Sequence, residues 1–76
     1  MNKTRRKSLQ TAVLYIDKAI DIINDAKYDE QGCIDNTPEN FQNSERYEAM
    51  ESAVDNLEEA ADSLKEALHY IEKAVE

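Results

Sequence analysis

Residues 53–76 read AVDNLEE-AADSLKE-ALHYIEK-AVE when they are written in blocks of seven. Every block begins with alanine and continues with an aliphatic residue, and the fifth position is Leu57, Leu64 or Ile71. Apolar residues spaced by three and four lie on one face of an α-helix. In heptad letters the leading alanines occupy position g, and the aliphatic residues that follow occupy a and d. This stretch therefore predicts a helix that packs against other helices.

The same heptad lettering fits the first part of the chain. Its a and d positions are the aliphatic residues Leu9, Val13, Ile16, Ile20 and Ile23, and alanine again recurs every seven residues beside them. We expect one helix over about residues 6–30 and a second over about 45–75, with residues 1–5 frayed. This pattern predicts an all-α fold in which a single domain, residues 1–76, forms an antiparallel two-helix hairpin.

The connection between the helices carries the local signals of turns and caps. Gly32 is the only glycine, and we expect it to end the first helix as a left-handed cap. Cys33 to Asn43 would then form the loop, in which Thr37-Pro38-Glu39 is typical of a helix start with a threonine N-cap and predicts a short helical turn over 38–42. Asn43-Ser44 offers an N-cap for the second long helix, which should begin near Glu45. The apolar loop residues Ile34 and Phe41 should close the open end of the hairpin.

The apolar face of the first helix is too wide for one partner helix. Tyr15 and Ile22 occupy position c, which neighbours the alanine position g on the helical wheel. Leaving this arc in water would expose an apolar patch of a size that monomers rarely show. We therefore predict a homodimer of hairpins that forms a four-helix bundle. The predicted interface comprises Ala12, Tyr15, Ile16, Ala19, Ile22, Ile23 and Ala26.

The composition argues against several classes of function and of site. Aspartate and glutamate number 17 against 9 lysines and arginines, so the net charge is −8, which disfavours nonspecific binding to nucleic acids or anionic membranes. No apolar run approaches the roughly 18 residues of a membrane span, and no signal-peptide pattern is present. The single cysteine, Cys33, excludes an internal disulfide and a multi-cysteine metal site, and we expect a half-buried loop thiol. We expect a cytoplasmic protein without a membrane partner.

The carboxylates of the second helix do not form a pattern typical of catalysis or metal binding. The acids Asp55, Glu58, Glu59, Asp62 and Glu66 fall at positions b, e and f, which point to solvent. Di-iron bundles need inward-facing Glu-x-x-His motifs, but the only histidine, His69, is at position b and the glutamate three residues earlier, Glu66, is at position f, so both point outward. Cys33 has no histidine near it in sequence to act as a base. We therefore expect no catalytic residue, no metal site and no cofactor.

The basic cluster Lys3, Arg5, Arg6 and Lys7 holds four of the nine basic residues. Such a cluster could contact phosphates, as basic helices of small RNA-binding dimers do. Alternatively, the hairpin would bring it near Glu72, Glu76 and the C-terminal carboxylate, and the cluster would then have a structural role. Our interpretation is a non-enzymatic protein–protein interaction module with an unknown protein partner. The alternative is a small dimeric RNA- or DNA-binding regulator.

The segment Asn36 to Glu51 reads NTPENFQNSERYEAME and is followed by the alanine and leucine heptads. It resembles a group of short uncharacterised bacterial and prophage-type helical proteins, in which a P-E-N-[LF]-Q-x-S-E-R-Y-E-like run precedes an acidic helix. The resemblance covers residues 36–76, and the specific run is about a dozen residues within it. Because that group has no assigned activity, the resemblance implies an all-helical fold but transfers no site residues.

Overall fold

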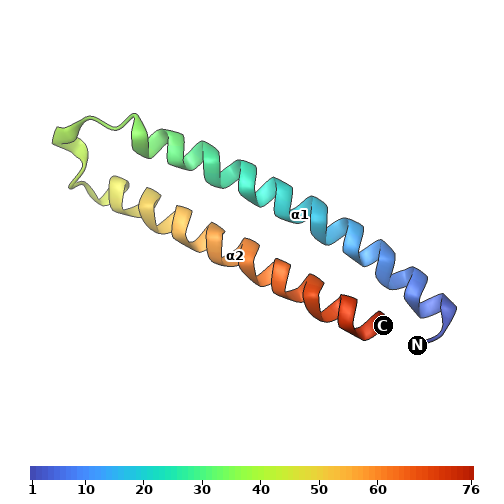
Figure 1. Ribbon diagram of the computed structural model, residues 1–76. Coiled ribbons are helices and arrows are strands. Elements are labelled where there is room, and N and C mark those ends of the chain that lie inside the picture. The colour runs from blue at the N-terminus through green and yellow to red at the C-terminus, as the bar shows by residue number, and fades with distance from the viewer.

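A computed structural model describes residues 1–76 as a hairpin of two long helices (Figure 1). Helix α1 spans Lys3–Asp35, a short 3₁₀ helix η1 spans Glu39–Phe41, and helix α2 spans Glu45–Val75. The two long helices run antiparallel and contact each other along their length, so both termini lie at one end of the hairpin and η1 lies at the other. The predicted all-α hairpin is confirmed.

The heptad seams form the contact between the helices. All five predicted seam residues of α1, from Leu9 to Ile23, are buried or half-buried. The same holds on α2 for Met50, Val54, Leu57, Ala61, Leu64, Leu68, Ile71 and Val75. Only Ile20, Ile34 and Ala61 are fully buried. A hairpin of two helices therefore has a seam of half-buried contacts with very few fully enclosed side chains.

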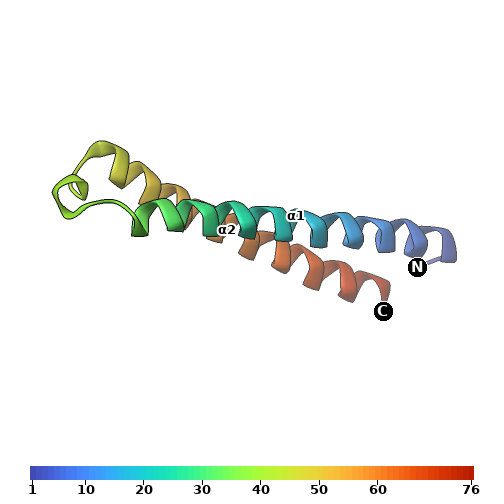
Figure 2. The ribbon, with the colours of Figure 1, turned by 90° about the horizontal axis from the view of Figure 1, so that it is seen from above.

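The hairpin is a rod rather than a globule. Its principal extents are 59 × 15 × 13 Å, and its radius of gyration is 17.4 Å, against about 11 Å for a compact domain of this length. In the two perpendicular views, α1 and α2 form one layer, and α1 continues past the end of α2 at the termini (Figures 1 and 2). No third element covers either side of this layer.

Helix α1 is longer at both ends than the sequence suggested. Asn2 is its N-cap, and the Asn2 side-chain oxygen accepts a 2.9 Å hydrogen bond from the backbone N–H of Arg5. The helix thus starts at Lys3 instead of residue 6. At the other end, the prediction that Gly32 terminates the helix is wrong, because no glycine has a positive φ and α1 continues to Asp35. The additional turn buries Ile34, which offsets the cost of an internal glycine.

The connection differs from the expected loop in three further details. Cys33 lies within α1 and is exposed, so the prediction of a half-buried loop thiol is wrong. Thr37 is not an N-cap, because its hydroxyl donates a 2.8 Å hydrogen bond back to the Cys33 carbonyl at the end of α1. Pro38 precedes η1 without any side-chain cap. Phe41 does not close the hairpin, since its side chain is 57% exposed, whereas Ile34 is buried there as predicted.

Ser44 joins η1 to α2, as the sequence predicted. Its hydroxyl donates to the Phe41 carbonyl at 2.8 Å and accepts from the backbone N–H of Tyr47 at 3.2 Å. One side chain therefore satisfies a carbonyl of the preceding turn and an otherwise unpaired N–H of the first turn of α2. The predicted helical turn over 38–42 is confirmed as η1, and α2 begins at Glu45 as expected.

Replacing Gly32 with alanine should stabilise the hairpin. The position is helical, and a β-carbon built on it would meet no atom within 4 Å. Because alanine favours the helix over glycine, we expect the Gly32→Ala variant to raise the free energy of unfolding by about 0.5–1 kcal/mol in urea denaturation. A loss of stability instead would mean that residue 32 adopts the left-handed conformation.

Replacing Ser44 with alanine should have the opposite effect. The loss of the cap leaves the Tyr47 N–H without its side-chain acceptor, so we expect the free energy of unfolding to fall by about 1 kcal/mol. The matched control is Asn43→Ala at the neighbouring exposed position, which should change stability by less than about 0.5 kcal/mol. Equal effects of the two substitutions in the same denaturation assay would contradict the capping role.

Candidate functional site

The side of α1 that was predicted as a dimer interface is incompletely covered by α2. Tyr15 is 71% exposed and Ile22 is 59% exposed, although both are large apolar side chains within a helix. Of the other predicted interface residues, Ala26 is exposed, while Ala12, Ile16, Ala19 and Ile23 are half-buried. We call the residues at positions c and g, namely Ala12, Tyr15, Ala19, Ile22 and Ala26, the α1 strip.

The corresponding side of α2 is lined by small residues. Because the helices run antiparallel and their a and d positions face each other, the g positions of both helices flank the same side of the seam. On α2 these positions are Ala53, Ala60, Ala67 and Ala74, and Tyr70 stands beside them at position c with 58% exposure. Small side chains on this side would let a further helix approach closely. The α1 strip and the α2 alanines together form a continuous, weakly polar side of the hairpin.

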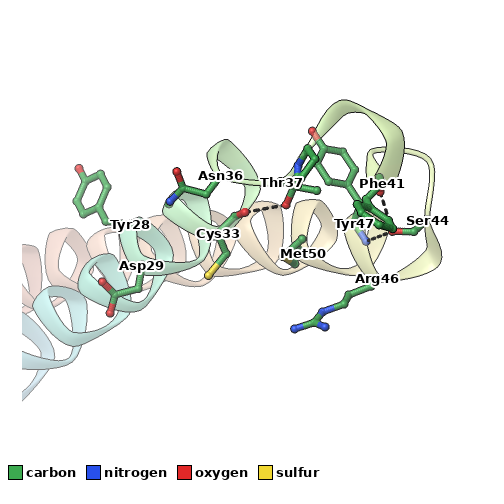
Figure 3. A pocket seen from close by; sticks show the side chains of 12 residues that line it. Tyr28, Asp29, Cys33, Asn36, Thr37, Phe41, Ser44, Arg46, Tyr47 and Met50 are labelled. Carbon is green, nitrogen blue, oxygen red and sulfur yellow. Dashed lines mark hydrogen bonds between the residues drawn. The ribbon is translucent and has the colours of Figure 1, made fainter.

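A groove of about 740 Å³ lies at the loop end of the hairpin (Figure 3). It is bounded by the last turns of α1, the connection and the first two turns of α2, through residues that include Tyr28, Cys33, Phe41, Tyr47 and Met50. Asp29 and Arg46 are the charged residues of its lining. Tyr28 is exposed, and the Lys27 ammonium lies 5.1 Å from the centre of its ring. The groove combines apolar walls with one acid and one base.

The groove does not bring together a nucleophile, a base and an orienting group. Cys33 lies at the loop end, whereas His69 is near the opposite end of the rod, beside Tyr70 with 5.9 Å between ring centres. The acidic residues from Asp55 to Glu66 are all exposed, as their heptad positions predicted. No group of three or more histidine, cysteine, aspartate or glutamate side chains is placed to hold a metal ion.

The basic cluster occupies the first two turns of α1. Lys3, Arg5, Arg6 and Lys7 are all exposed, on the part of α1 nearest the chain termini. The C-terminal end of α2 lies at the same end of the rod, which is the placement that the structural interpretation of these cations assumed (Figure 1). Neither long helix has a stretch of the length and hydropathy required to cross a bilayer.

The groove could not have been found by motif analysis. Its lining residues come from three segments between residues 28 and 50, namely the end of α1, the connection and the start of α2. Only the folded end of the hairpin brings these three segments together. Sequence reasoning did identify the exposed tyrosine and isoleucine of the α1 strip, because the heptad position of each residue fixes its direction. No family model, no curated protein and no solved structure matches this chain.

Proposed function

We propose that the protein is a non-enzymatic interaction module that works as a homodimeric four-helix bundle. The observation that carries the proposal is the exposure of Tyr15 and Ile22 on a regular helical face. A cytoplasmic location fits a chain with one exposed, unpaired cysteine.

The surface area of the hairpin supports association. A folded monomer of 8.7 kDa is expected to expose about 4,700 Å². This chain exposes 5975 Å². The excess is larger than the roughly 800 Å² that each partner buries in a standard protein–protein interface. A second hairpin packed on the α1 strip and the α2 alanines would remove this excess and supply the core that one hairpin lacks.

Sedimentation equilibrium and thermal melting at several concentrations test the dimer. We expect a mass of two chains at micromolar concentration and a melting temperature that rises with protein concentration, because only the folded state associates. A single-chain mass with a melting temperature independent of concentration would contradict the proposal.

The acidic face of α2 is the surface that we propose for a separate protein partner. Glu59 and Glu66 lie at position f, which points away from both the seam and the alanine side, so they remain available in a dimer. In a capture experiment at low salt, a basic protein that binds the wild-type chain should no longer bind when Glu59 and Glu66 are both changed to glutamine. Asp17→Asn with Asp25→Asn, two exposed positions on α1 outside the α1 strip, is the control with the same charge change.

A second candidate function is RNA or DNA binding through the basic cluster. The observation in its favour is that four exposed cations occupy the first two turns of α1. Fluorescence anisotropy with labelled single-stranded RNA and duplex DNA tests it, with the four cations changed to glutamine as control. Phosphate contacts would give binding that weakens steeply between about 50 and 200 mM salt. No binding at the lower salt concentration would eliminate this candidate.

A further inference from the structure

The charge of the hairpin is separated along its length. The terminal end, residues 1–16 and 65–76, carries six basic and three acidic side chains, a net charge of +3. The loop end, residues 29–51, carries seven acidic side chains and one arginine, a net charge of −6. The acids near the C-terminus therefore do not balance the basic cluster within one chain.

The charges of α1 also oppose its own helix dipole. The first turn of α1 contains no acid and its last turn contains no base, although a helix favours anions at the N-terminus and cations at the C-terminus. Helix α2 follows the rule, with Glu45 and Glu48 in its first turn and Lys73 in its last. A second α1 that runs in the opposite direction would offset this unfavourable arrangement, because it would place the cations of each copy beside the acidic end of the other.

The alanine column of the α1 strip is centred on Ala19. Ala12 and Ala26 lie seven residues before and after Ala19, and Arg5 and Cys33 lie fourteen residues before and after it at the same heptad position. A two-fold axis through Ala19, perpendicular to the rod, would therefore lay each α1 along the α1 of a second copy. This pairing places Arg5 of one protomer beside Cys33 of its partner, within about one helical turn of Asp29.

The groove lies where that pairing would bring the partner's N-terminal segment. Asp29, Gly32, Cys33 and Asn36 line the groove, and in the two-fold arrangement they face residues 2–9 of the second copy. These residues offer the basic cluster to Asp29 and to the acids around the groove, while Met1, which is half exposed, offers an apolar side chain to its walls. The opposite arrangement, with parallel rods, would place two loop ends side by side, each with a net charge of −6.

We propose that two hairpins pack as antiparallel rods, and that the basic N-terminal segment of each chain occupies the loop-end groove of the other. The inference rests on the dimer proposed above and specifies its orientation and the occupant of the groove. The basic cluster then contacts carboxylates of a second copy of this chain, so nucleic acid is not needed to account for it.

A spin label on the Asp35→Cys variant, in a chain whose only cysteine is changed by Cys33→Ser, distinguishes the arrangements, because residue 35 is exposed, lies at position b away from the α1 strip and does not line the groove. Antiparallel rods place the two labelled positions about 48 Å apart along the axis, from sixteen residues on either side of Ala19 at ~1.5 Å each. Parallel rods place them less than about 20 Å apart, given helix spacings of 8–10 Å. A long distance in pulsed dipolar spectroscopy is the expected result. A short distance would overturn the orientation and keep the dimer, whereas no dipolar signal would overturn both.

A charge exchange tests the contact itself. Arg5→Glu should raise the dissociation constant of the dimer about tenfold, since each dimer would contain the contact between Arg5 and Asp29 twice. Adding Asp29→Lys to the same chain should restore it. Lys65→Glu, which makes the same charge change off the strip on α2, is the control. Sedimentation in which Arg5→Glu and Lys65→Glu weaken the dimer equally, or in which Asp29→Lys restores nothing, would overturn the placement of the N-terminal segment in the groove.

Discussion

Replacing Ile20 with alanine is expected to lower the free energy of unfolding by about 2–5 kcal/mol per chain. Ile20 is 7% exposed and lies midway along α1, in a hairpin with only three fully buried residues. The substitution removes apolar surface that is buried on folding and leaves a cavity that two long helices can fill only by bending. Because domains of this size are marginally stable, a loss of this magnitude should shift the urea midpoint strongly.

Leu14→Ala is the matched control for this substitution. It also replaces a large aliphatic residue of α1, but Leu14 is 70% exposed and lies at position b, away from both the seam and the α1 strip. We expect it to change the free energy of unfolding by less than about 0.5 kcal/mol. Similar losses for Ile20→Ala and Leu14→Ala would mean that the seam does not hold the hairpin together.

The parts of the fold that sequence reasoning predicted are those fixed by periodicity and by short-range capping. The seam residues on both helices follow from spacings of three and four, which set the direction of every side chain once the helix forms. Ser44 was predictable as an N-cap because its hydroxyl acts on a backbone group only three residues away. The exposure of Tyr15 and Ile22 follows from their heptad position in the same way.

The parts that sequence reasoning missed depend on contacts between distant residues. A lone glycine has a strong local preference for a cap, but here the burial of Ile34 in the folded hairpin carries the helix past Gly32. The lettering itself contained the missing signal, since Ile34 falls on position a when the heptads are continued through Lys27 and Glu30. The loop-end groove is even harder to predict from the sequence, because its shape depends on how the connection that joins the two helices folds.

Replacing Ile22 with glutamate is expected to dissociate the dimer. Within one chain the side chain is 59% exposed, so a carboxylate there remains in water and the hairpin should keep its helical circular dichroism. In the dimer, however, the same position lies inside the α1 strip, near the two-fold axis, and each chain would bury one unpaired carboxylate. At about 1–3 kcal/mol or more for each such group, two of them should raise the dissociation constant at least about 30-fold.

Leu14→Glu separates this effect from a general loss of apolar surface. The control introduces the same side chain on the same helix, at a residue even more exposed than Ile22 but displaced around the helix from the α1 strip. We expect it to leave the sedimentation behaviour unchanged, so that at one concentration the control is a dimer and Ile22→Glu is a monomer. If Leu14→Glu dissociated the chains and Ile22→Glu did not, the second hairpin would have to pack on the position-b side of α1. Cys33, which is at heptad position g like the alanines of the strip, would then lie outside the interface. The basic end of one chain would no longer face the groove of the other, which would contradict the antiparallel pairing.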